Sequence, residues 1–212
     1  MAPAVKIRRS AFIAAALAFL AASGACQTSA PCQTSAGCQP SAADQVSELR
    51  RRAIAGEAGG LAARLEEAAT DPVDGQDLRL ELNRALRVES DPAVVRVMLP
   101  VLVRAHRFGQ HPVDDLVTTF DHLLQSSEGA QVGVLMASIK FAPSEARVQI
   151  APAVAEVMLG ESDPLLQLGW LEVLHSAGAQ GRVALQEAIA RSSLEEIELQ
   201  WARSRLDDWP PG

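Results

Sequence analysis

The sequence predicts an all-α protein, and three observations support this prediction. Residues 89–99, 126–136 and 161–171 align with one another, so one unit recurs every 35–37 residues. A period in this range is typical of stacked helical hairpins. The aligned segments also begin with residues that start helices. No segment shows the apolar and polar alternation that indicates a half-buried strand. We therefore expect an α-solenoid of antiparallel helix pairs.

An Asp-Pro pair opens the first helix in two of the three repeats. Asp91 and Asp163 can accept hydrogen bonds from the free amides of the first turn. Pro92 and Pro164 suit the first helical position, because the amide there has no partner in any case. Gly129 takes the equivalent place in the middle repeat. The first helices are therefore expected at 129–141 and 164–176, and from residue 92 in the first repeat.

Apolar residues follow helical spacing in the first repeat. Its first helix places Val94, Met98, Val101, Leu102 and Ala105 on one face. A second helix is expected over 112–126, with acidic residues in its first turn, where the helix dipole favours negative charge. Its apolar stripe consists of Val113, Leu116, Val117, Phe120, Leu123 and Leu124. This arrangement predicts two amphipathic helices that pack face to face.

The other helices follow from the same signals. Second helices are expected at 144–159 and 181–191, and three upstream helices at 44–55, 61–69 and 76–88. Ser193 to Glu196 has the form of a capping box, so the last helix should begin at Ser193 and run to about Leu206. Pro100 and Pro152 fall inside expected helices, and each should kink its helix by removing a backbone hydrogen bond. The folded domain is thus expected to span residues 44–209.

The Asp-Pro starts, the repeat period and the internal prolines resemble HEAT repeats over about residues 89–191. The arginine and alanine positions of that family are kept only in part, and Arg96 lies one place later than the family's usual arginine. The resemblance implies a HEAT-like solenoid whose second helices line the concave side. A generic helical bundle is the alternative.

Residues 1–25 have the layout of a secretory signal peptide. Three basic residues precede an uncharged apolar run over 11–22, and small residues follow it. This run is shorter than the roughly 20 residues that a membrane-spanning helix needs. The order Ser23, Gly24, Ala25, Cys26 resembles the lipobox of bacterial lipoproteins, except that the family prefers leucine in place of Ser23.

The lipoprotein resemblance implies that the leader is cut before Cys26 and that the Cys26 thiol receives a diacylglycerol. The protein would then be secreted across the inner membrane and anchored in the cell envelope. Simple secretion and an uncleaved anchor are the alternatives. Residues 26–43 repeat a six-residue unit three times without charge or large apolar groups, so we expect a flexible tether.

All three cysteines, Cys26, Cys32 and Cys38, lie in this expected tether. Their spacing lacks the close cysteine pair of a zinc site, so we expect no metal there. In an oxidising compartment Cys32 and Cys38 can pair with each other or with another chain. The expected helical domain contains no cysteine, so no disulfide would stabilise it.

The charge balance and the absence of motifs narrow the function. Without residues 1–25 the chain has 16 basic and 26 acidic residues, a net charge of −10, which should repel nucleic acid. No phosphate loop, dinucleotide fingerprint or nucleophile elbow is present, so we expect no cofactor. Asp115 and His122 share a helical face, but without a third ligand a solvated polar face is the better interpretation.

We therefore predict a non-catalytic module for protein–protein interaction, held at a membrane through a lipid on Cys26. Exposed Asp115, Asp121 and Glu156 would make part of the concave side acidic and favour a basic protein or peptide partner. His122 lies on the same expected surface, and Trp209 either docks onto the last helices or contacts a partner. The alternative function is an extracytoplasmic helical enzyme or an accessory subunit of an envelope complex.

Overall fold

The computed structural model describes residues 40–210, without the side chains of residues 197 and 198. Cys26, Cys32 and Cys38 lie outside the described residues. All regular structure in residues 40–210 is helical, which confirms the all-α prediction. The helices are α1 (Ala42–Ala55), α2 (Gly59–Thr70), α3 (Gln76–Leu86), α4 (Pro92–Gly109), α5 (Asp114–Ser126), α6 (Ala130–Phe141), α7 (Ser144–Gly160), α8 (Pro164–Ser176), α9 (Ala179–Arg191) and α10 (Glu196–Asp207).

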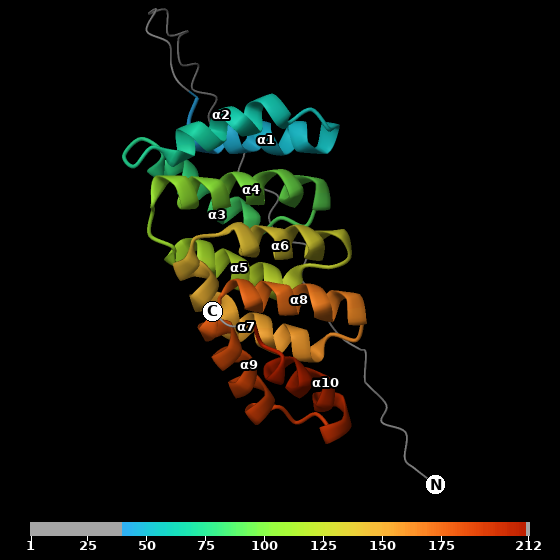
Figure 1. Cartoon of the computed structure of the whole chain (residues 1–212). Helices are drawn as coiled ribbons and strands as arrows, with labels where there is room; N and C mark the ends of the chain where they lie inside the picture. The colour runs from blue at the N-terminus through green and yellow to red at the C-terminus, as the bar shows by residue number, and fades with distance from the viewer. Residues whose placement is uncertain (1–39, 211–212) are drawn as a thin grey trace, which may run out of the picture. The chain divides into compact units, whose positions relative to one another are not determined.

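Contacts sort the helices into two rows (Figure 1). One row contains α2, α4, α6 and α8, and each of these helices packs on the next. The other contains α1, α3, α5, α7 and α9, packed in the same order, and α10 packs on α9. The three aligned sequence segments form the starts of α4, α6 and α8, so equivalent sequence occupies equivalent places in one row. The core lies between the rows.

Apolar residues at helical spacing form this core, as predicted from the stripes of the first repeat. Val94, Met98, Leu102 and Ala105 of α4 are fully buried. Phe120 of α5 faces them and is also fully buried. Trp170 of α8 is also buried and is only 2 % exposed. Truncation of such large side chains is the usual route to severe destabilisation.

The predicted Asp-Pro helix starts are confirmed. The Asp91 carboxylate accepts a hydrogen bond from the Ala93 amide at 2.8 Å, and Asp163 accepts one from the Leu165 amide at 2.8 Å. The following prolines occupy the first turn of α4 and α8. Each aspartate therefore satisfies an amide that the helix itself leaves without a partner.

Asp163→Ala is expected to lower the free energy of unfolding by about 1 kcal/mol, because the Leu165 amide loses its acceptor. Urea denaturation of the purified chain measures this change. Asp121→Ala is the control, since Asp121 is an exposed acid within α5 whose loss should cost less than about 0.5 kcal/mol. Equal decreases in the free energy of unfolding of the two variants would contradict the capping role of Asp163.

Ion pairs connect neighbouring helices within each row. Arg104 of α4 pairs with Glu66 of α2 at 3.1 Å, and Lys140 of α6 pairs with Glu172 of α8 at 2.7 Å. In the other row, Arg191 of α9 pairs with Glu156 of α7 at 3.0 Å. These pairs are exposed, so each contributes at most about 1 kcal/mol. They fix the alignment of adjacent helices more than they stabilise the fold.

Arginines also cap the C-terminal ends of helices in the α2 to α8 row. Arg79 donates to the Ala69 carbonyl of α2 at 2.6 Å, and Arg107 donates to the Phe141 carbonyl of α6 at 2.8 Å. Arg147 of α7 donates in the same way to the Ser176 carbonyl of α8. A cation at this end satisfies a free carbonyl and complements the negative end of the helix dipole.

Several helix boundaries differ from the prediction by one to three residues, and the cause is clear at two of them. The first helix begins at Ala42, two residues early, because the Ser41 side chain and Asp44 form a capping box. α4 continues to Gly109 and ends where Gln110 adopts a left-handed conformation with φ 54°. The predicted start of the last helix at Ser193 is wrong: the Ser192 hydroxyl accepts from the Leu194 amide and turns the chain, and α10 begins at Glu196.

Candidate functional site

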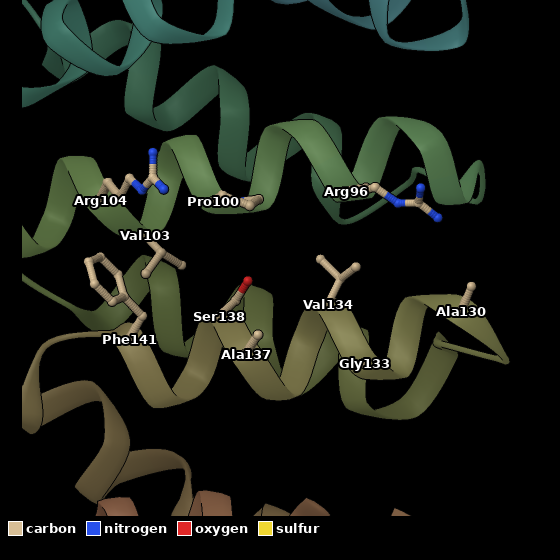
Figure 2. A pocket seen from close by; sticks show the side chains of 10 residues that line it. All are labelled: Arg96, Pro100, Val103, Arg104, Ala130, Gly133, Val134, Ala137, Ser138 and Phe141. Carbon is tan, nitrogen blue, oxygen red and sulfur yellow. The ribbon is translucent and has the colours of Figure 1, made fainter. Parts of the chain in front are cut away.

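An apolar groove runs between α4 and α6 on the outer side of their row (Figure 2). It has a volume of about 630 Å³. α4 lines one wall with Arg96, Pro100, Val103 and Arg104, and α6 lines the other with Ala130, Gly133, Val134, Ala137, Ser138 and Phe141. The groove is a sizeable surface feature in the size range of ligand-binding pockets.

The sequence of α6 explains why this groove is both open and apolar. Leu135 and Ile139 of α6 are buried in the core, as expected for an inward face. The part of the outward face that lines the groove is uncharged and is made mainly of small residues, with Gly133 and Ala137 exposed, while the exposed Lys140 pairs with Glu172 of α8. A Cβ built on Gly133 meets no atom within 4 Å. Small side chains on α6 therefore leave the space that larger residues would fill.

Pro100 gives the α4 wall an unusual backbone. It lies inside α4, as the sequence predicts, and it has no amide hydrogen. The Arg96 carbonyl, one turn earlier, therefore cannot receive its ordinary helical hydrogen bond. The proline ring itself lines the middle of the groove (Figure 2). This wall thus combines an apolar surface with a backbone acceptor.

Arginines border the groove along α4, with Arg96 toward one end and Arg104 toward the other (Figure 2). Arg104 is paired with Glu66 at 3.1 Å and its side chain is 51 % exposed. Arg96 is exposed and forms no ion pair with any residue in 40–210. The unpaired Arg96 therefore places positive charge at one end of the groove, and Glu66 partly offsets the charge of Arg104 at the other, although the whole chain has a net charge of −7.

An exposed aromatic cluster closes the end of the groove near Arg104. The rings of Phe108 and Phe141 meet edge to face, with centroids 6.1 Å apart. The Arg107 guanidinium lies over the Phe141 ring at 4.1 Å from its centroid and also donates to the Phe141 carbonyl. Phe108 is 59 % exposed and Phe141 is 39 % exposed. Two large exposed rings held in fixed positions are typical of contact sites on protein surfaces.

The predicted partner-binding residues lie away from this groove. Asp115 of α5 is paired with Arg87 at 3.3 Å, and Glu156 of α7 is paired with Arg191 at 3.0 Å. Asp121 and His122 of α5 are exposed, and Asp121 accepts a hydrogen bond from Gln125 at 3.2 Å. Two of the three predicted acidic residues thus already have a cationic partner within the domain.

Trp209 docks back onto the helices. Its indole is half-buried and meets the His175 ring of α8 edge to face, with centroids 4.4 Å apart. Burial lowers the pKa of the His175 imidazole that packs against this indole. Of the two interpretations of Trp209 from the sequence, this geometry favours docking.

No pattern considered in the sequence predicted the groove between α4 and α6. Its walls come from segments that lie more than 25 residues apart, so no local motif marks it. A signal was nevertheless present, because α6 is apolar on its outward side as well as its inward side. A surface helix normally has a polar outer face. This departure, together with Phe108 and Phe141, would have indicated an unpartnered surface.

Comparison with known proteins gives no relative: no family model, curated protein or solved structure matches this chain. None of the helices in residues 40–210 combines the length and the apolar character needed to cross a membrane. Within the same residues, no cluster of three or more His, Cys, Asp or Glu side chains is placed to hold a metal ion. The groove is therefore interpreted from its own chemistry.

Proposed function

We propose that this chain is a lipid-anchored envelope protein whose helical domain binds a segment of another protein, without catalysis, in the groove between α4 and α6. The apolar groove with its arginine border and aromatic end is the observation that carries this proposal. We further propose that the domain is a HEAT-like α-solenoid. The ordered contacts within two rows and the recurrence of aligned sequence at α4, α6 and α8 support that class.

The groove best suits an amphipathic helix with acidic residues. Its α6 wall extends from Ala130 to Phe141, which corresponds to roughly 16 Å at about 1.5 Å per residue, or three helical turns. Small residues on α6 let a partner backbone approach closely, and apolar side chains would cover Val134 and Pro100. Carboxylates on the partner would meet Arg96 and Arg104. Charge complementarity of this kind sets orientation and specificity.

A pair of synthetic helical peptides tests this proposal with the full chain in a mild detergent. Both peptides have three turns and the same leucine and alanine face, and they carry either glutamate or lysine at both ends. We expect the acidic peptide to bind at least about tenfold more tightly, which corresponds to about 1.4 kcal/mol. Equal binding of the two peptides, or tighter binding of the basic one, would contradict the proposed charge recognition.

Gly133→Leu is expected to abolish binding of the acidic peptide, because a leucine side chain fills the groove where the Cβ has free space. Gly60→Leu is the matched control: Gly60 is also an exposed helical glycine with no atom within 4 Å of a built Cβ, and it lies in α2 away from the groove. Fluorescence anisotropy measures both variants. Binding that survives Gly133→Leu would refute the groove as the site.

The proposed lipid anchor places this groove near a membrane. A flexible tether of 18 residues reaches roughly 20–25 Å, which would hold the domain clear of lipid headgroups. Anchoring confines the domain to a thin layer and so raises its local concentration for partners in the same layer.

Cys26→Ala is expected to release the protein from the membrane fraction, because the thiol that would carry the diacylglycerol is lost. Fractionation of cells followed by immunoblotting measures the change, with Cys32→Ala as the control. Unchanged membrane association of Cys26→Ala would remove the anchor from the proposal but leave the peptide test of the groove intact.

A basic partner for the α5, α7 and α9 surface stays a prediction from the sequence. The ion pairs of Asp115 with Arg87 and of Glu156 with Arg191 reduce the negative charge available there. The groove between α4 and α6 combines a mostly apolar lining with the unpaired Arg96, so it is the better candidate.

A further inference from the structure

A second, smaller pocket lies where α3 and α4 meet the start of α5. It has a volume of about 250 Å³ and shares no residue with the groove. Its polar lining consists of Gln76, Arg79, Asn83, His106, His111 and Asp115. Arg79, Asn83, His106 and His111 of this lining are buried, whereas Gln76 and Asp115 are exposed. Four buried polar side chains around one pocket are unusual in a small helical domain, because each buried polar group needs a partner.

The walls of this pocket are held firmly in place. The Arg79 guanidinium donates to the carbonyls of Ala69 and Asp71 at 2.6 and 2.7 Å. The His111 Nε2 lies 3.0 Å from the Thr70 carbonyl. Gly109 is needed for this arrangement, since a Cβ there would lie 2.7 Å from the Thr70 carbonyl and closer still to the His111 ring. The end of α2 therefore fixes both Arg79 and His111.

His106 is the one buried side chain in this pocket that these contacts do not satisfy. The residue is 3 % exposed, and neither ring nitrogen forms a well-aligned hydrogen bond with the described residues, although the Pro112 backbone acts on the ring as a weak acceptor. Its ring meets the His111 ring edge to face at 6.0 Å. A neutral imidazole offers one donor and one acceptor, and leaving both unused in the interior costs free energy. His106 thus points to a molecule that occupies the pocket.

The charge in the pocket indicates what that molecule is. Arg79 is 7 % exposed and has no carboxylate within ion-pair distance among the described residues. The C-terminal end of α2 offsets only about half of its charge. The nearby Asp71 carboxylate, held by the amides of Val73 and Asp74 at 2.8 Å, acts on Arg79 only through space, and Asp115 is paired with Arg87. A buried guanidinium with incomplete compensation favours an anion.

We propose that this pocket binds a small oxyanion, a carboxylate or a phosphate group of a small molecule, held by Arg79 and His106. Arg79 supplies the positive charge, and the His106 N–H supplies a directed donor. The volume of about 250 Å³ corresponds to roughly eight water molecules at about 30 Å³ each, so the ligand is a small acid and not a peptide.

Nuclear magnetic resonance of the histidine rings tests the proposal on the full ¹⁵N-labelled chain in a mild detergent. Sodium acetate and inorganic phosphate are the probes for the two sources of oxyanion, and sodium chloride at equal ionic strength is the control. We expect acetate, phosphate or both to shift the ring signals of His106 and His111 saturably, while exposed His122 stays unchanged. The stronger probe identifies the carboxylate or the phosphate class. No saturable shift with either probe, or equal shifts in His122, would overturn the proposal.

His106→Leu separates binding from a purely structural role. Replacing an unsatisfied buried polar side chain with an apolar one of similar size should preserve the fold. We expect at least tenfold weaker binding of the effective probe, followed on the His111 ring, with His122→Leu as the matched control. Unchanged binding in His106→Leu would overturn the role of His106, and His106→Gln, which keeps a donor, is expected to restore part of the binding. The groove is untouched by these variants, so peptide binding should persist in all of them.

Discussion

Gly181→Ala is expected to lower the free energy of unfolding by about 3 kcal/mol or more, in spite of the higher helix propensity of alanine. Gly181 is buried in α9 at the point where this helix passes the end of α8. A Cβ on Gly181 would lie 2.8 Å from the Leu174 carbonyl carbon and closer still to its oxygen. These atoms belong to the backbone and cannot rotate away, so α8 and α9 must separate. Overpacking of this kind typically costs 1–3 kcal/mol, and a backbone clash lies at the upper end.

Gly133→Ala is the control for Gly181→Ala. Gly133 is also inside a helix, but a Cβ there meets no atom within 4 Å. We therefore expect Gly133→Ala to stabilise the domain by about 0.5–1 kcal/mol through the propensity difference alone. Guanidinium chloride denaturation of both variants measures the two changes. A stability of Gly181→Ala equal to that of the unmodified protein would show that α8 and α9 are not in close backbone contact.

Acidification from pH 7 to about pH 4 is expected to remove about 3 kcal/mol of stability through His106. Burial is the main reason that the pKa of His106 falls from 6.5 to about 4; the charges of His111 and Arg79 act in the same direction, and the Pro112 backbone and Asp115 act in the opposite direction. Well above pH 6.5 the ring is neutral in both states, so its protonation does not affect stability. Between pH 6.5 and pH 4 the histidine is protonated in the unfolded chain but stays neutral in the folded chain. The free energy of unfolding therefore decreases as the pH is lowered through this range. Each unit of pKa difference between the unfolded and the folded chain corresponds to about 1.4 kcal/mol, which gives the expected loss of stability.

His106→Leu isolates this effect. Its stability should depend less on pH between 6.5 and 4.5 than that of the unmodified chain, whereas His122→Leu should keep the full dependence because His122 is exposed. Carboxylates act at lower pH: arginine hydrogen bonds lower the pKa of Glu48 to about 2, so its contribution is lost only below about pH 4.5. Urea denaturation at a series of pH values, without acetate or phosphate in the buffer, provides the comparison. Parallel pH curves for His106→Leu and the unmodified chain would contradict the burial of a neutral His106.

Local signals in the sequence predicted most of the helices well. Asp91 with Pro92 and Asp163 with Pro164 define helix starts by chemistry that needs only neighbouring residues. The C-terminal end of α4 was harder to predict, because it depends on the left-handed conformation of Gln110, which residues other than glycine rarely adopt. The predicted start of α10 was wrong for a related reason. Ser192 and Ser193 are both residue types that can cap a helix, and it is the Ser192 hydroxyl that accepts the hydrogen bond of the turn.

Neither site could be predicted from local sequence. The groove depends on the distance between α4 and α6, which bring Arg104 and Phe141 together across 37 positions of the chain. The oxyanion pocket depends on Arg79 from α3 meeting His106 from α4. The rings of His106 and His111 also meet at this pocket. The helical turn through Gly109 is what lets the two rings meet.

The succession of contacts within the two rows has a mechanical consequence. Helices with substantial contact are never more than three apart along the chain, so there is no long-range closure that joins the first helix to the last. A pulling force applied at α1 would therefore act on one interface at a time and detach helices in order, with a series of small force peaks in place of a single rupture. If the segment before residue 40 is anchored, α1 would be the first helix to yield, whereas α4 and α6 would stay joined until the helices before them had detached.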